Sequence, residues 1–252
     1  DLARGGDREL LELPSHQKSL IENVSKVSRR TVVLLEGGSA IQVNDWLGKV
    51  DALMMVWYPG REGGNAIARV LFGDVTPSGK LPVSIPVSMN QLMDWDVHAL
   101  DVNHDLLHGY RYLDHHNHQP EFPFGFGLSY TTFTLEALQV EKDFDSFKAV
   151  VSVTNTGSVV GAEVVQLYVE CTESEVFRVP KELKGFGRVM LEPGETIDLE
   201  LELSEQDLKY YEPDKHGWVL EACRYNMLIG TSSRDLLLSS AWDFDGGEWR
   251  PV

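Results

Sequence analysis

The chain has 252 residues, a formal net charge of −17 at pH 7 and an apolar content of 42%, which is enough for one large core or two modest ones. The negative charge argues against nucleic acid or an anionic membrane as a partner, because both would repel the chain. No apolar run approaches the roughly 20 residues of a membrane-spanning helix, so we expect no membrane partner.

The first third of the chain alternates helical and strand patterns. Apolar residues recur at helical spacing over about 16–28, which predicts an amphipathic helix. Two continuous apolar runs, 31–35 and 51–57, are typical of strands that are covered on both faces in a parallel sheet. A second helix is predicted over 65–72, with Gly73 as its C-cap. This alternation of strands and helices indicates an α/β layer.

The next stretch carries weaker signals. Prolines within 80–86 make this extended segment an edge or exit strand. Residues 87–121 show little periodicity and are predicted to form a long irregular connection, and loops of this kind are often functional. Residues 122–133 (FPFGFGLSYTTF) crowd phenylalanines beside Pro123 and two glycines, which favours a hydrophobic linker that docks two domains.

After residue 131 the apolar residues recur at every second position. Predicted strands of this kind include 147–153, 165–169, 197–203 and 225–229. Turn sequences separate them: 155–157 (NTG), 192–194 (EPG) and 213–217 (PDKHG). Several short alternating strands with such spacing predict an antiparallel β-sandwich of the immunoglobulin or fibronectin type III kind.

The chain has two cysteines, Cys171 and Cys223, both in the strand-rich half. One disulfide between them is an open alternative. We expect two free apolar thiols instead, because a core of this size does not need a covalent link.

A glycine-rich loop, 60–65 (GREGGN), lies between a predicted strand and a predicted helix. It lacks the Lys-Ser/Thr ending of a phosphate-binding P-loop, which disfavours a nucleotide site. The carboxyl end of a parallel strand is nevertheless where α/β sheets bind ligands. Trp57 and Tyr58 could stack on a sugar ring, and Arg61 and Glu62 could bind its hydroxyls. The alternative for the two aromatic residues is packing in the core.

Histidines gather in the irregular connection: His98, His104, His108, His115, His116 and His118. A metal site needs several imidazoles held in fixed geometry, and no metal-binding motif accompanies them. We therefore expect a solvated loop and no metal.

Three carboxylates near the start of the chain, Asp7, Glu9 and Glu12, could suggest a catalytic pair. Glycoside hydrolysis uses two carboxyl groups that flank the scissile bond. The sequence does not show their separation, and the alternative is an acidic flank at the start of a helix.

Four parts of the sequence, in order and over nearly the whole chain, carry a resemblance to one enzyme family. They are 7–14 (DRELLELP); 57–66 (WYPGREGGNA) with 70–74 (VLFGD) and 77–82 (PSGKLP); 109–112 (GYRY) with 122–133; and 179–186 (VPKELKGF) with 191–194 (LEPG) and 232–235 (SSRD). Together they resemble the C-terminal half of glycoside hydrolase family 3, the β-glucosidase and β-xylosidase family.

The resemblance implies an enzyme of three parts. A (β/α)8 barrel carries the aspartate nucleophile, an α/β sandwich lends the general acid/base, and a fibronectin type III-like domain ends the chain. The resemblance assigns 1–86 to the C-terminal part of the α/β sandwich, 87–126 to a connection and 127–252 to the fibronectin type III-like domain. The barrel and its nucleophile would lie outside this sequence, which begins at Asp1 and is expected to be a mature product or a fragment.

In many members of this family a glutamate stands before the Asp-Arg pair that matches Asp7 and Arg8. Here Arg4 occupies that position. Arginine cannot donate a proton near neutral pH, because its pKa exceeds about 12. The catalytic residues of the chain are therefore unknown, and Glu9 is the fallback. The candidate substrate-binding residues are Asp7, Arg8, Trp57, Tyr58, Arg61 and Glu62.

The resemblance implies a retaining β-glycosidase that acts on terminal non-reducing β-D-glucosyl or related residues, without a cofactor. Its partners would be the carbohydrate substrate and an N-terminal barrel portion in the same or another chain, and this chain alone would be inactive. The alternative is a non-catalytic carbohydrate-binding or structural module. Oligomeric state and compartment are left open.

Overall fold

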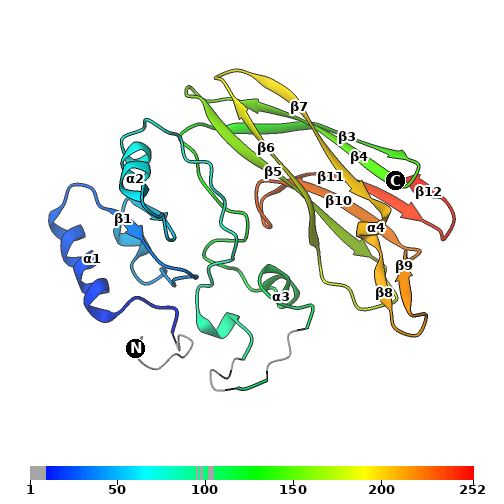
Figure 1. The fold of residues 1–252 in the computed structure, drawn as a ribbon, viewed down its shortest axis with the longest axis horizontal. Helices are drawn as coiled ribbons and strands as arrows, with labels where there is room; N and C mark the ends of the chain where they lie inside the picture. The colour runs from blue at the N-terminus through cyan, green and yellow to red at the C-terminus, as the bar shows by residue number, and fades with distance from the viewer. Residues whose placement is uncertain (1–9, 95, 97–98, 102–104) are drawn as a thin grey trace. The chain divides into compact units, whose positions relative to one another are not determined.

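The computed structural model describes residues 10–94, 96, 99–101 and 105–252 (Figure 1). The chain divides into two compact units that interleave along the sequence. Unit 1 comprises Asp1–Val75 and Val83–Pro123, and unit 2 comprises Thr76–Pro82 and Phe124–Val252. Over the described residues, no helix is long and apolar enough to cross a membrane.

Unit 1 contains an α/β layer around a short parallel sheet. Helix α1 (Ser15–Val27) precedes strand β1 (Val32–Leu35), and β2 (Ala52–Met55) pairs with β1 in parallel along its whole length. Helix α2 (Gly63–Leu71) follows β2, and Gly73 adopts a left-handed φ of +83° just after it. These elements confirm the helices and strands predicted for this part of the chain.

Short helices interrupt the loops of unit 1. They are η1 (Leu47–Lys49), η2 (Met89–Gln91) and α3 (Tyr110–His115). The prediction of a wholly irregular connection over 87–121 was wrong at α3, because a helix of six residues is too short to show a period in the sequence. Residues 80–86 do not form a regular strand either, and the backbone instead makes an isolated antiparallel bridge between Ile85 and Phe122.

Unit 2 is an antiparallel β-sandwich, which confirms the predicted fold class. Its elements are β3 (Phe133–Asp143), β4 (Ser146–Asn155), β5 (Gly161–Thr172), β6 (Glu182–Leu191), β7 (Thr196–Ser204), α4 (Glu205–Leu208), β8 (Tyr210–Glu212), β9 (Gly217–Val219), β10 (Arg224–Gly230), β11 (Leu236–Phe244) and β12 (Trp249–Pro251). One sheet has the order β12-β11-β10-β5-β6 and the other β3-β4-β7, and β8 and β9 form a separate hairpin (Figure 1).

The core of unit 2 lies between the two larger sheets. Phe147 and Val151 of β4 face Leu167 of β5 and Met227 of β10 in one buried cluster. Successive side chains of a strand point to opposite faces, so the alternating sequence pattern places these residues inside. Trp249 of β12 closes the cluster with its ring edge-on to Phe147, at a centroid distance of 4.8 Å.

Residues 76–82, here called the strap, belong to unit 2 although they precede most of it by more than 40 residues. Lys80 Nζ lies 2.7 Å from Glu163 Oε1, and both side chains are nearly buried. The backbone N–H of Leu81 donates to the carbonyl of Phe126 at 2.8 Å, and the N–H of Gly125 donates to the carbonyl of Leu81 at 2.8 Å. The strap is therefore bound to the sandwich by an ion pair and by backbone hydrogen bonds.

The motif at 122–133 is fixed on unit 2 by a buried glutamine. Gln166 Nε2 donates to the carbonyls of Gly125 at 3.2 Å and Thr231 at 2.6 Å, and its Oε1 accepts from the Tyr168 hydroxyl at 2.6 Å. Gly125 has a φ of +81°, and a Cβ there would overlap the Gln166 amide. The boundary between the units falls inside the motif, after Pro123.

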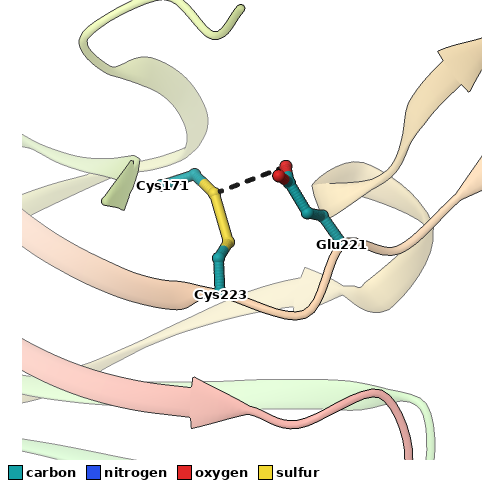
Figure 2. Close-up of side chains that lie close together, drawn as sticks. All are labelled: Cys171, Glu221 and Cys223. Atoms are coloured by element: carbon teal, nitrogen blue, oxygen red, sulfur yellow. Dashed lines mark hydrogen bonds between the residues drawn. A yellow bond between two sulfur atoms is a disulfide. The ribbon is translucent and has the colours of Figure 1, made fainter. Parts of the chain in front are cut away.

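Cys171 and Cys223 form a disulfide, so the expectation of two free thiols was wrong (Figure 2). The pairing follows from the antiparallel register of β5 and β10, in which Cys171 lies opposite Tyr225. Cys223 directly precedes β10, and the two Cα atoms are 6.7 Å apart, within reach of a disulfide. The sequence could not show this register, because it depends on the pairing of two strands distant in sequence, and the two cysteines are 52 residues apart.

Candidate functional site

A hollow of about 940 Å³ lies in unit 1. It is lined by Leu11, Glu12, Leu13, Pro14, Gln17, Glu36, Gly37, Gly38, Ser39, Ile41, Tyr58, Met89, Leu92, Met93, His108, Gly109 and Tyr112. The loops after β1 and β2 both contribute, so the hollow opens at the carboxyl end of the parallel sheet, where α/β sheets bind ligands. Its volume is within the range of small-molecule sites.

The loop after β1 shapes the hollow around Tyr58. A Cβ on Gly38 would lie 2.8 Å from Cε2 of Tyr58, so only glycine lets the aromatic ring lie against this loop. Glu36 and Ser39 flank the glycines and line the same hollow. Sequence reasoning missed this loop as part of a site. The available signal was its position, since Gly38 follows the end of β1 by three residues, as Tyr58 follows the end of β2.

Trp57 and Tyr58 follow β2 and have different environments. Trp57 has a φ of +53°, which is rare for a bulky residue and marks local backbone strain. Its side chain is half-buried, whereas Tyr58 is 75% exposed and lines the hollow. Packing in the core therefore does not account for Tyr58. The strained turn at Trp57 is the point at which the chain leaves β2 and presents the next ring to the hollow.

Arg61 and Glu62 lie in the turn before α2, and the structure does not bring them into the lining of the hollow. Both are exposed. Glu62 Oε2 accepts a hydrogen bond from Nδ2 of Asn65 at 2.6 Å, within the first turn of α2. The geometry links Glu62 to the start of this helix.

The candidates nearest the start of the chain, Arg4, Asp7, Arg8 and Glu9, lie outside the described residues. Glu12 is described, and its Oε2 accepts from Lys18 Nζ at 2.6 Å at the edge of the hollow. Hydrogen bonds to Glu12 and then to Asp45 raise the pKa of Lys18.

Histidines of the connection fall in three places. His98 and His104 lie outside the described residues, and His108 lines the hollow. His116 Nδ1 lies 2.9 Å from the carbonyl of Tyr112, and the two rings pack with centroids 4.1 Å apart. His118 Nδ1 lies 3.2 Å from the carbonyl of Gln91. These contacts hold the imidazoles of His116 and His118 against the backbone around α3 and η2.

In the described part of the chain, one group of three potential metal ligands lies close together: Cys171, Glu221 and Cys223 of unit 2 (Figure 2). The two sulfur atoms are bonded to each other, and Glu221 accepts hydrogen bonds from Ser174 and Arg178. The disulfide leaves no thiolate to bind a cation, so this group is a structural cluster.

Comparisons with known proteins match both units. The family model of the glycosyl hydrolase family 3 C-terminal domain matches residues 3–130, and the fibronectin type III-like domain matches 163–233. A "Beta-glucosidase" of Kluyveromyces marxianus is 40% identical over 92% of this chain and 28% of its own length. An "Exo-alpha-(1->6)-L-arabinopyranosidase" of Bifidobacterium longum is 36% identical over 99% of this chain and 34% of its own length.

Solved structures show the same likeness. A GH3 beta-glucosidase of Bifidobacterium adolescentis has a TM-score of 0.90 at 36% identity, over 95% of this chain and 36% of its own. Beta-D-glucoside glucohydrolase of Trichoderma reesei has a TM-score of 0.89 at 30% identity, over 94% of this chain and 37% of its own. The chain thus spans about a third of the length of these relatives. It belongs to glycosyl hydrolase family 3 and is the C-terminal part of that family's longer chains.

Proposed function

We propose that this chain is the C-terminal portion of a retaining β-glycosidase that hydrolyses terminal non-reducing β-D-glucosyl or related residues. The observation that carries the proposal is the hollow at the carboxyl end of β1 and β2, in a chain that is 40% identical to a β-glucosidase over 92% of its length. The hollow would form one wall of a sugar site.

The residues in the hollow suit a neutral sugar. The exposed ring of Tyr58 offers a flat apolar face for the C–H face of a pyranose. The Gln17 amide and the Glu36 carboxylate line the same space and could bind hydroxyl groups. Asp7 and Arg8 remain candidates for the same wall. Arg61 and Glu62 stand apart from the lining, so we assign them no contact with the sugar.

The chemistry itself would come from carboxyl groups outside the described residues. Retention of configuration requires two carboxyl groups about 5–5.5 Å apart, one as nucleophile and one as acid/base. The nucleophile is proposed to lie in a barrel portion. The acid/base is unassigned, because Arg4 occupies the position of the family's glutamate and Glu9 is the fallback.

Exposed apolar side chains on unit 1 are evidence that this chain belongs to a longer enzyme. Val32 and Leu34 of β1 and Phe72 after α2 are exposed, although strands of a parallel sheet are normally covered on both faces. Within unit 1, no described element covers these side chains. Further elements of the α/β layer would bury them, and relatives about three times as long have room for such elements in the same chain.

The test is the substitution Tyr58→Ala in the complete enzyme. Loss of the stacked ring is expected to raise KM for an aryl β-D-glucoside, and the inhibition constant for glucose, by about 10-fold, with a smaller change in kcat. Tyr58→Phe keeps the ring and should retain most of the affinity. Arg61→Ala removes a side chain three residues further on, outside the lining, and is expected to leave both constants unchanged.

If Tyr58→Ala left both KM and the glucose inhibition constant unchanged, the hollow would not be part of the sugar site. Failure of the complete enzyme to hydrolyse any aryl β-glycoside would remove the enzymatic function.

The second candidate is a non-catalytic carbohydrate-binding module, which the arginine at position 4 favours. This function predicts that sugar binds while no glycoside is cleaved. Assaying hydrolysis and binding on one preparation of the complete protein separates the two functions.

A further inference from the structure

The β8–β9 hairpin of unit 2 exposes two large aromatic side chains. Tyr211 and Trp218 lie directly opposite each other across the hairpin, with ring centroids 5.8 Å apart in an edge-to-face arrangement. They are 50% and 60% exposed. Because strand residues alternate between faces, both rings project from one face and Tyr210 lies on the other. We call Tyr211 and Trp218 the aromatic pair.

The back of the hairpin is firmly attached to the sandwich. The guanidinium of Arg178 lies 4.8 Å from the centroid of the Tyr210 ring, and its Nη1 donates to the carbonyl of Leu208 at 3.3 Å. Arg178 Nε also donates to Glu221 at 3.2 Å, and Glu221 lies beside the Cys171–Cys223 disulfide (Figure 2). The hairpin is thereby held on its Tyr210 face, while on the other face the two rings of the aromatic pair contact each other.

The size of the exposed surface limits its partner. Two aromatic rings at these exposures offer roughly 200–300 Å² of surface. A stable protein interface buries about 800 Å² on each partner, so the pair is too small to hold another protein or a second copy of this chain. One or two sugar rings are of matching size.

Charge and chemistry limit the partner further. The chain carries a net charge of −17, so a polyanion would be repelled from it. The tyrosine hydroxyl and the indole N–H add polar groups to the flat apolar rings. A pyranose has an apolar C–H face and a rim of hydroxyls, which matches this combination.

We propose that the aromatic pair binds a neutral polysaccharide chain, with a sugar ring stacked on Trp218. The inference rests on the proposed function only for the class of carbohydrate, a β-glucan. It assigns a binding surface to unit 2 and gives the fibronectin type III-like domain a part in holding polymeric substrate.

The test is affinity electrophoresis of the full 252-residue chain through gels that contain a soluble mixed-linkage β-glucan. The unmodified chain is expected to be retarded, and Trp218→Ala and Tyr211→Ala should each weaken the apparent affinity by about 10-fold or more. Trp218→Phe should retain part of the retardation, because a ring remains. The matched control is Phe144→Ala, which removes a 95% exposed aromatic ring from the β3–β4 turn and should change nothing.

Three results would overturn the proposal: no retardation of the unmodified chain, equal retardation of Trp218→Ala, or equal retardation by heparin, which would indicate electrostatic binding. A concentration-dependent dimer in sedimentation that Trp218→Ala abolishes would assign the pair to self-association instead. Hydrolysis of an aryl β-glucoside by the complete enzyme is measured separately. Glucan retardation without hydrolysis would reject only the proposed function. Hydrolysis without glucan retardation would reject only the binding role of the aromatic pair.

Discussion

Gly127 is a residue at which the backbone leaves no room for a side chain. A Cβ there would overlap the carbonyl oxygen of Gly79 in the strap. Gly127→Ala is therefore expected to lower the free energy of unfolding of unit 2 by about 2 kcal/mol, because the strap must move. Urea denaturation should show a lower midpoint with an unchanged m value.

The strap supplies its own control for this substitution. A Cβ on Gly79 would meet no atom within 4 Å, so Gly79→Ala should leave the midpoint where it is. Equal effects of the two substitutions would show that the close approach at Gly127 does not contribute to stability.

The sequence identified Tyr58 as a candidate site residue but could not rank it above its neighbours. Trp57, Tyr58, Arg61 and Glu62 fall in one loop, and spacing alone does not say which side chains enter a hollow. The structure separates them because Trp57 has a left-handed backbone while Arg61 and Glu62 lie at the start of α2. A strained φ at a tryptophan depends on surrounding contacts, so no local pattern predicts it.

The segment between β5 and β6 is attached to the sandwich through Glu221. Burial alone would raise the pKa of Glu221, but hydrogen bonds from Ser174, from the backbone N–H of Glu175 and from Arg178 outweigh it and lower the pKa. A lowered folded-state pKa means that the carboxylate stabilises the fold above its unfolded value near 4.5. This stabilisation is lost as the pH falls through the lower folded-state pKa.

Glu221→Gln is therefore expected to flatten the fall of Tm on acidification below pH 4.5. Thermal melts of both proteins across this acid range measure the effect. Glu200→Gln is the control, because Glu200 is an exposed partner of Lys148 and such pairs contribute little. Identical slopes for Glu221→Gln and the unmodified chain would contradict the prediction.

The elements with the clearest pattern could be predicted from period and turn residues. Strands β4, β5, β7 and β10 were found because alternate apolar positions face one core, and α1, β1, β2 and α2 because each pattern is continuous. Contacts between segments distant in sequence could not be predicted. The disulfide and the attachment of the hairpin through Arg178 both depend on register, which the two segments set only when they meet.

At the scale of the molecule, the two compact units differ in how well they bury apolar surface. Unit 2 has a continuous core, whereas unit 1 has a two-stranded sheet with exposed Val32 and Leu34. Calorimetry of the full chain is expected to show two transitions, with unit 1 melting first. Gly127→Ala should lower only the later one. A single transition that shifts as a whole would show that the units unfold together.

The boundaries predicted at 86 and 126 treat the chain as a series of contiguous pieces, and as domain boundaries they stay a prediction. The compact units instead interleave, because the strap joins unit 2. A composition shift marks where patterns change along the chain. It carries no information about a seven-residue segment that binds elsewhere.

The strap also bears on how this domain can be moved between proteins. A graft that begins at residue 127 would leave behind Lys80, which pairs with Glu163 and donates to the carbonyl of Gly127. The transplanted sandwich would then carry a nearly buried carboxylate without its cation. An unpaired buried charge strongly destabilises a fold. Recombination that moves this domain as a working module must therefore also move the strap, residues 76–82, in front of the sandwich.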